Sequence, residues 1–374
     1  MPGVHALLSP SASHRWLNCP PSVRLTEGMD NETSVFAEEG TCAHSLCEYK
    51  VKQAIGIQEE DPRPTLKYLD EEMEECSDEY RNFVMETLSK TEEETGSKPF
   101  ISIEERLDIS RYVPDCSGTG DCVICSDGVL HIIDFKYGSG VKVDAERNSQ
   151  LMIYALGAYE LFKMLYDVKV VRMTIFQPRM ANVSTYEMPI EDLPFWATEE
   201  LMPKAALAFN GAGEMASGPW CKFCKLKPCC KKRAEENMAS VREDFALPPV
   251  LSNEEVSGIL DKASEIKNWL TDIEGYAFEV LQKGGDIPGY KLVEGKSNRK
   301  YTDEEAVAST VQKAGYDPYE KRVLGITAMT SLLGKKKFNE LLSPLVIKPQ
   351  GKPTLAPLSD ERKAINTITN DFND

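Results

Sequence analysis

The spacing of apolar residues along the chain predicts alternating helices and strands. Apolar positions recur at helical intervals in these segments: 36–55, 68–94, 148–166, 191–210, 252–282, 302–314 and 326–342. β-Branched and apolar runs bounded by glycine or proline predict strands over 99–109, 121–136 and 168–178. Because strands and helices interleave before about residue 245, we expect an α/β fold there, with a mixed central sheet flanked by helices.

The pattern of apolar residues changes near residue 245. With 374 residues, the chain is too long for one small domain. The sheet-forming patterns all lie in 1–245, whereas 246–347 shows mostly helical spacing. The last segment, 348–374, is rich in proline, lysine and aspartate. We therefore expect a sheet domain, a mostly helical accessory domain and a loosely ordered tail.

Charge and hydropathy limit the classes of function that we expect for this protein. Apolar residues make up 41% of the chain, enough for a real core, and the net charge is −17. A strongly acidic chain argues against general affinity for nucleic acid, because binding a polyanion depends on lysine and arginine. No run approaches the roughly 18 apolar residues of a membrane span, and the first residues do not resemble a secretory signal. We expect a cytoplasmic protein with no membrane partner.

Three of the eleven cysteines stand out by their spacing. Cys221, Cys224 and Cys230 form a C-x2-C-x5-C pattern, which lets thiolates converge on one metal ion or cluster. We expect the lysines between them to lower the pKa values of these thiols. We interpret the following cysteines as small buried hydrophobic residues: Cys42, Cys47, Cys76, Cys116, Cys122, Cys125 and Cys229. Cys122 and Cys125 are an odd number of positions apart and should point to opposite faces of a strand.

The segment around Asp127-Gly128 predicts a β-hairpin with chemistry at its open end. Asp-Gly suits a two-residue type I′ turn, in which Ser126 pairs with Val129. Asp121 then lies directly opposite Asp134, on one face of the sheet.

Lys136 follows Asp134 by two residues and shares that face. Opposed carboxylates repel one another unless a cation lies between them, so the pattern suits Mg²⁺ or Mn²⁺, with the lysine supporting negative charge that develops at a phosphorus. The alternative is a solvated pair whose repulsion Lys136 relieves, and the spacing alone does not choose between the two.

Further motifs accompany the hairpin in a recognisable order. His44 lies in E-E-G-T-C-A-H, D-F-K covers 134–136, and Gln150 and Tyr154 form Q-x-x-x-Y, one helical turn apart. Cys19, in L-N-C-P, precedes all of these. Together with the cysteine trio, this order resembles the PD-(D/E)XK nuclease core of the RecB-type branch. The resemblance covers roughly 9–235 and is strongest to a phage-encoded group similar to the AddB-type and CRISPR-associated iron–sulfur nucleases.

The resemblance implies a role for each matched residue. His44, Asp121 and Asp134 would ligate a Mg²⁺ or Mn²⁺ ion together with the backbone carbonyl of Phe135. Lys136 would be the catalytic lysine, and Gln150 and Tyr154 would steady the site or touch substrate. A [4Fe–4S] cluster would be held by Cys19, Cys221, Cys224 and Cys230. Cys229, adjacent to Cys230, leaves the fourth cluster ligand open.

Two other segments have competing interpretations. Glu105, just before the hairpin, is either an accessory carboxylate or an ordinary exposed residue, and we favour the second. The segment 289–301 lacks the spacing of a phosphate-binding loop, so we expect no nucleotide cofactor. Its basic residues either contact phosphates or are simply solvated: Lys291, Lys296, Arg299 and Lys300.

The resemblance implies a metal-dependent DNA nuclease, with exonuclease activity favoured, acting in phage recombination, replication or repair in the bacterial cytoplasm. Hydrolysis would leave 5′-phosphate and 3′-hydroxyl ends. Its expected partners are single- or double-stranded DNA ends, with a phage recombinase or single-strand-binding protein as a further partner. The alternative is a non-catalytic DNA-binding or scaffolding module whose cysteines hold a structural zinc ion.

Overall fold

The computed structural model describes residues 6–29, 34–243, 253–294, 301–319 and 322–347, with isolated positions beyond; between 240 and 243 it describes the backbone only. The chain divides into two compact units, residues 1–279 and 280–374. The boundary that we expected near residue 245 and most of the expected tail lie outside the described residues.

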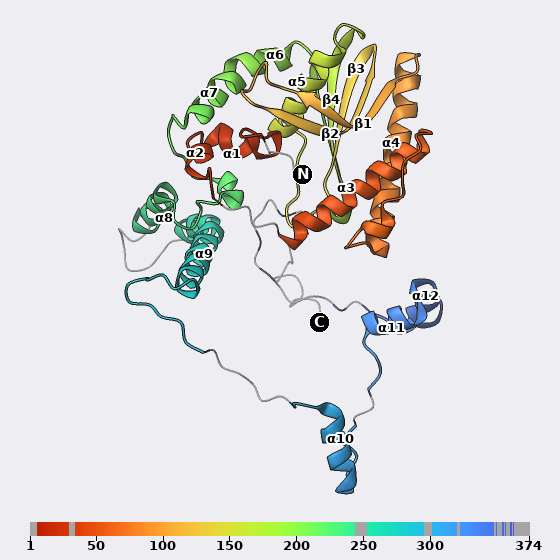
Figure 1. The fold of residues 1–374 in the computed structure, drawn as a ribbon, viewed down its shortest axis with the longest axis vertical. Coiled ribbons are helices and arrows are strands. Elements are labelled where there is room, and N and C mark those ends of the chain that lie inside the picture. The colour runs from red at the N-terminus through yellow and green to blue at the C-terminus, as the bar shows by residue number, and fades with distance from the viewer. Residues whose placement is uncertain are drawn as a thin grey trace, which may run out of the picture. The chain divides into compact units, whose positions relative to one another are not determined.

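A five-stranded mixed sheet forms the centre of the first unit (Figure 1). The strands lie in chain order and have these bounds: β1 Phe100–Asp108, β2 Ser117–Ser126, β3 Gly128–Phe135, β4 Val168–Gln177 and β5 Asn182–Pro189. Neighbouring strands are antiparallel except β3 and β4, which are parallel. The expected α/β architecture is confirmed. β5 was not expected, because this edge strand is half-exposed and carries little apolar signal.

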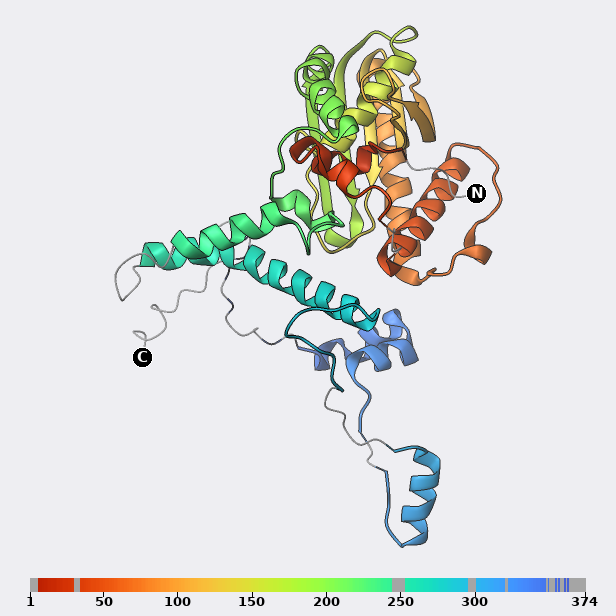
Figure 2. The same cartoon turned by 60° about the vertical axis from the view of Figure 1, so that its left-hand side comes forward.

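Helices cover both faces of the sheet. α3 (Val35–Ala54) and α4 (Glu71–Thr95) lie on one face, and α5 (Ser149–Phe162), α6 (Asp192–Trp196) and α7 (Met202–Asn210) lie on the other, as Figures 1 and 2 show. A separate buried core lies on each face.

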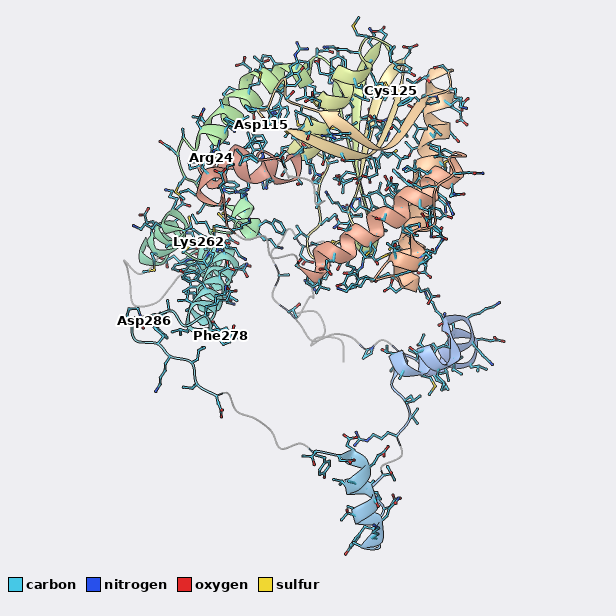
Figure 3. The ribbon with its side chains drawn as sticks, viewed as in Figure 1. Arg24, Asp115, Cys125, Lys262, Phe278 and Asp286 are labelled. Atoms are coloured by element: carbon cyan, nitrogen blue, oxygen red, sulfur yellow. The ribbon has the colours of Figure 1, made fainter. Side chains whose placement is uncertain are left out.

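Alternation along β2 supplies both cores. Cys122 and Ile124 belong to the α3–α4 core, whereas Val123 and Cys125 belong to the α5 core; Cys125 is labelled in Figure 3. Two residues an odd number of positions apart point to opposite sides of a strand. The expectation that Cys122 and Cys125 point to opposite faces is confirmed.

Local capping sets where the main helices begin and end. The Asp70 side chain accepts a 2.8 Å hydrogen bond from the Met73 N–H at the start of α4, and Gly96, at φ 68°, ends that helix. Asn148 caps α5 in the same way by accepting from the Gln150 and Leu151 N–H groups. The Asn148 cap fixes the start of α5 at the position where the Q-x-x-x-Y motif begins.

The N-terminal segment is held beside the last helices of the sheet domain. α1 (Ser13–Asn18) and α2 (Ser22–Leu25) pack against α7. Arg24, labelled in Figure 3, donates a 2.6 Å hydrogen bond to the Phe209 carbonyl. Farther along, Lys225 Nζ donates to the Met29 carbonyl at 2.7 Å. Residues about 200 positions apart in sequence thus lie side by side.

Several helices differ from the sequence prediction. The helix expected over 191–210 is divided into α6, a π-helical turn at Ala197–Leu201, and α7. α8 (Lys231–Glu243) was not expected, because its mostly charged sequence shows little apolar spacing. α9 (Asn253–Gln282) agrees with the prediction, and its residues Glu265 and Asp272 pair with Arg233 of α8.

The second unit contains short helices. The helix expected over 326–342 is interrupted at Gly334, whose φ of 74° ends one helix before the next begins. The helices of this unit have these bounds: α10 Glu304–Lys313, α11 Ile326–Leu333 and α12 Lys335–Leu342. The 3-10 segments along the chain have these bounds: η1 Pro10–Ala12, η2 Arg63–Thr65, η3 Pro178–Met180, η5 Pro219–Phe223 and η6 Ser343–Leu345.

Among the described residues, no helix has both the length and the apolar character needed to cross a membrane.

Candidate metal centre and cysteine site

The β2–β3 hairpin has the predicted register but a different turn. The pairs run from Ser126 opposite Val129 to Cys122 opposite Ile133, as expected. Gly128 has a φ of 94°, but Asp127 does not have the positive φ that a type I′ turn requires. A tertiary contact explains the difference, because the Asp127 carboxylate accepts from the Asp167 N–H and the Gly128 N–H donates to the Asp167 carbonyl, both at 2.9 Å.

At the open end of the hairpin, a side chain extends the hydrogen bonding between β2 and β3. The backbone ladder stops at Cys122 and Ile133, one pair before the two expected carboxylates. The Phe135 N–H donates a 2.7 Å hydrogen bond to Oδ2 of Asp121. The Asp121 carboxylate is thereby fixed at the strand end, where its other oxygen, Oδ1, lies 3.5 Å from Nδ1 of His44 on α3.

A backbone irregularity in β1 places a second carboxylate at this position. Ile103 packs on the α3–α4 core and Leu107 on the α5 core, although residues four apart in a regular strand share a face. Between them, Glu104 has a φ of 53°, which is rare for a non-glycine residue. Paired residues on either side are Ile103 with Cys122 and Glu105 with Gly120. The irregularity therefore leaves Glu104 beside Asp121.

Ligand atoms of three side chains converge at the hairpin end. One atom each from His44, Glu104 and Asp121 lie within 4.8 Å of one another. The three residues come from α3, β1 and β2. The His44 ring also contacts the Phe135 ring edge-to-face, with the centroids 5.3 Å apart, which restricts its orientation. An imidazole nitrogen with carboxylate oxygens is a donor set that fits a divalent ion such as Mn²⁺.

The three groups change one another's protonation. Burial lowers the pKa of His44, but the charge and hydrogen bond of Asp121 outweigh it and raise that pKa to about 9. Burial raises the pKa of Asp121, but His44 overrides it, and the net pKa is below its ordinary value. Burial, and then the charge of Asp121, raise the pKa of Glu104 to about 7. Without a cation, the site therefore balances these carboxylates with a protonated imidazole.

Asp134 lies in a second group of polar side chains. Its Oδ2 lies 2.9 Å from Lys136 Nζ, and its Oδ1 accepts from Lys136 at 3.2 Å and from the Gln150 amide at 3.0 Å. Gln150 Oε1 accepts from Lys136 at 3.1 Å, and the Gln150 amide also lies 3.3 Å from the Tyr154 hydroxyl. The Q-x-x-x-Y residues thus reach the D-F-K segment from α5.

Burial and charge act oppositely on this second group. Burial raises the pKa of Asp134, and the charge of Asp121 adds to the increase, although Lys136 opposes it. Burial lowers the pKa of Lys136, but the charges of Asp134 and Asp121 outweigh it and raise that pKa. The lysine is therefore held in its charged form beside Asp134.

The structure brings most predicted site residues to one place, in two groups. His44 and Asp121 form the first group with Glu104, while Asp134, Lys136, Gln150 and Tyr154 form the second. Metal ligation by His44, Asp121, Asp134 and the Phe135 carbonyl stays a prediction.

Sequence reasoning missed Glu104 and considered its neighbour instead. The Glu105 side chain hydrogen-bonds Ser102 of the same strand and is half-exposed. No local pattern distinguished the two glutamates, because the backbone conformation of Glu104 decides which of them faces the site.

Four cysteines meet at a second site. Cys19, Cys221, Cys224 and Cys230 line one cavity, which encloses about 340 Å³ of atom-free space, part of it open to solvent. Cys229 is exposed, and its thiol donates to the Leu226 carbonyl. The interpretation of Cys229 as a buried hydrophobic residue is wrong, and the structure places Cys230, not Cys229, with the other three.

The cysteine site differs from the sequence prediction in its electrostatics. Burial raises the pKa values of Cys221 and Cys224, and neighbouring cysteine charges add to this effect. The expectation that nearby lysines lower these pKa values is therefore wrong. Lys227 pairs with Asp272 at 2.8 Å, so its charge is partly neutralised by a carboxylate.

A zinc ion and an iron–sulfur cluster require different distances among the sulfur atoms that bind them. A tetrahedral zinc ion with Zn–S bonds of about 2.3 Å holds its sulfurs about 3.8 Å apart. Among the described residues, no three cysteine sulfurs lie within 4.8 Å of one another. An iron–sulfur cluster spreads its ligands over several iron atoms and takes a wider arrangement. Four cysteines that line one cavity are a ligand set that suits either a zinc ion or an iron–sulfur cluster.

The basic segment at 289–301 lies largely outside the described residues. Lys291 is exposed, whereas the placements of Lys296, Arg299 and Lys300 are not described. Contact of this segment with phosphates stays a prediction.

Comparison with known proteins gives one solved structure and one family model. The solved structure titled "Crystal structure of SSO0001" is 14% identical and covers 52% of this chain and 98% of its own, with a TM-score of 0.23. A family model described as "Protein of unknown function (DUF2800)" matches residues 5–363. Because that match spans nearly the whole chain, this protein belongs to the DUF2800 family.

Proposed function

We propose that this protein is a metal-dependent DNA nuclease with a PD-(D/E)XK fold, favouring exonuclease activity at DNA ends. The observation that carries the proposal is the open end of the β2–β3 hairpin, where Asp121 faces His44 and where Asp134 forms a partly buried ion pair with Lys136. The mixed sheet with helices on both faces, and β3 followed by α5 and the parallel β4, suits such a fold.

Each residue of the site has its own proposed role in phosphodiester hydrolysis. His44 and Asp121, with Asp134, would bind a Mg²⁺ or Mn²⁺ ion, which activates water and stabilises charge on a phosphate. Lys136 would orient the attacking water and stabilise the negative charge that develops at the phosphorus. Gln150, which contacts both Asp134 and Lys136, would keep the lysine aimed at the reacting phosphate.

DNA is the proposed partner despite the net charge of −17. Contact with the backbone would depend on local basic residues, so binding should weaken strongly as salt concentration rises. Lys222 and Lys231 are exposed near the cysteine site and are suited to phosphate contact. A phage recombinase or a single-strand-binding protein remains a proposed further partner.

The cysteine site is proposed to hold a structural [4Fe–4S] cluster. Such a cluster would join Cys19, at the end of α1, to Cys230, just before α8, and so close a long loop of chain. The second candidate function is a DNA-binding scaffold with structural zinc.

A nuclease assay tests the proposal directly. Full-length protein, purified anaerobically, is incubated with end-labelled linear DNA and with circular DNA, in Mg²⁺ or in Mn²⁺. We expect metal-dependent degradation that is lost in Lys136→Met and retained in Lys90→Met, which alters an exposed lysine on α4. Wild-type protein that is inert on single- and double-stranded DNA with both metals would reject the nuclease and leave the scaffold.

A further inference from the structure

Two adjacent glutamates of β1 have different surroundings. Glu105 pairs with Gly120 in the ladder and hydrogen-bonds Ser102. The Glu104 carboxylate makes no hydrogen bond or ion pair within the part of the chain that the structure describes, although the residue is only half-exposed. Its backbone adopts a φ of 53°, and its side chain lies beside His44 and Asp121. A carboxylate in such surroundings gains stability from a bound cation.

The three ligand atoms are suited to one octahedral ion. Metal–oxygen bonds of about 2.1 Å place ligands about 3 Å apart when adjacent and about 4.2 Å apart when opposite. One atom each from His44, Glu104 and Asp121 fall within 4.8 Å, which matches this range. Asp134 is not a member of this group, because its oxygens face Lys136 and the Gln150 amide.

We propose that His44, Glu104 and Asp121 are the principal ligands of the divalent cation, and that this site prefers Mn²⁺ to Mg²⁺. The proposal rests on the metal-dependent function proposed above and adds Glu104 as a ligand. Asp134 contributes less to holding this ion, because its carboxylate is paired with Lys136.

The preference for Mn²⁺ follows from the donor types. Mg²⁺ favours an all-oxygen octahedron that keeps several waters, whereas imidazole nitrogen suits transition metals. His44 Nδ1 is the atom that lies 3.5 Å from Asp121, so the nitrogen donor is directed into the group. The Phe135 ring against His44 limits the freedom of the imidazole to turn away.

The first test measures Mn²⁺ binding without any DNA. Full-length protein, purified anaerobically and freed of divalent cations, is titrated with Mn²⁺, and the free ion is followed by electron paramagnetic resonance. Glu104→Gln keeps the shape of the side chain but loses its charge, and we expect Mn²⁺ affinity to fall about tenfold or more. Glu105→Gln, at the next position of the same strand, is the matched control and should keep wild-type affinity. Equal affinity in wild type and Glu104→Gln would overturn the proposal.

A second readout identifies the ligands themselves. Bound Mn²⁺ should show coupling to an imidazole nitrogen in pulsed resonance spectra, and His44→Gln should remove this coupling. Asp134→Asn should weaken Mn²⁺ binding less than Glu104→Gln does. The reverse order, or wild-type spectra without nitrogen coupling, would overturn the position proposed for the ion.

The binding tests and the nuclease assay can fail separately. Mn²⁺ binding that depends on Glu104 in a protein inert on DNA would reject the nuclease and keep the cation position. If the protein cleaves DNA but its Mn²⁺ affinity is the same in wild type and Glu104→Gln, the result would reject only the proposal that Glu104 is a ligand. Thermal unfolding of each variant shows whether it is folded before either result is used.

Discussion

The Phe135 backbone N–H donates a 2.7 Å hydrogen bond to the Asp121 carboxylate where the β2–β3 ladder ends. One acidic side chain therefore supports the strand end with one oxygen and faces His44 with the other. The structural role and the proposed ligand role of Asp121 belong to different atoms, so different substitutions should separate them.

Substitution of Asp121 should separate the fold from the chemistry. Asp121→Asn keeps an oxygen that can accept from Phe135, whereas Asp121→Ala leaves that N–H without its partner. An unpaired buried donor costs about 1–3 kcal/mol, so the alanine variant should be less stable than the asparagine variant by that amount. Urea unfolding of the metal-free proteins measures the difference. Both variants should lose metal-dependent cleavage, and equal stabilities would contradict the structural role.

The adjacent cysteines offer a matched pair of variants. Cys230 lines the cysteine cavity, whereas Cys229 is exposed. Cys230→Ser should lose bound iron and the visible absorbance of a cluster, and should unfold at lower temperature because the long loop from Cys19 is no longer closed. Cys229→Ser should retain iron, colour and stability. Iron and sulfide analysis after anaerobic purification provides the measurement, and iron loss in Cys229→Ser alone would reverse the assignment.

Buried His131 should make the protein sensitive to acid. Its Nε2 lies 2.8 Å from the Thr174 hydroxyl, and burial, aided by the charge of Arg172, lowers its pKa to about 3. Between pH 6.5 and 3 the unfolded chain binds a proton at this residue and the folded chain does not. The stability contribution is therefore complete above pH 6.5 and decreases as pH falls, by roughly 1 kcal/mol per pH unit.

The measurement for His131 is the free energy of unfolding at pH 7 and at pH 5. We expect His131→Asn to show a smaller loss between these two values than the wild type, whatever its absolute stability. An unchanged pH dependence in this variant would show that other groups cause the acid sensitivity.

Two helical glycines should respond oppositely to alanine. A Cβ at Gly157 of α5 would lie 2.9 Å from the Leu107 Cβ and 3.2 Å from Ile109, whereas a Cβ at Gly275 of α9 meets nothing within 4 Å. Gly157→Ala should destabilise the protein by about 1–3 kcal/mol through overpacking. Gly275→Ala should stabilise α9 by about 0.5–1 kcal/mol through helix propensity. Thermal unfolding of both variants checks the signs, and a stabilised Gly157→Ala would contradict the packing described here.

Local patterns predicted what depends on neighbours in the chain. Alternation around Asp127-Gly128 predicted the pairing of β2 with β3, and the four-residue spacing of Gln150 and Tyr154 predicted their contact. Both follow from strand and helix geometry, which sets the face that a residue occupies wherever the element lies in the fold. The spacing of Cys221, Cys224 and Cys230 likewise predicted that these three meet, whereas Cys19 was expected only from the family resemblance.

Tertiary packing decided which side chains join the site from other elements. Glu104 enters through a positive φ in β1 that no local spacing indicates, and the turn at Asp127 follows its hydrogen bond to Asp167. Cys229 and Cys230 differ only in the direction that the folded loop gives them. The amino-acid sequence alone determined the register of β2 with β3 and the shared helix face of Gln150 and Tyr154, because those depend on repeating local geometry. The identity of the groups that converge across α3, β1 and β2 depends on how distant elements pack, and only the folded chain specifies it.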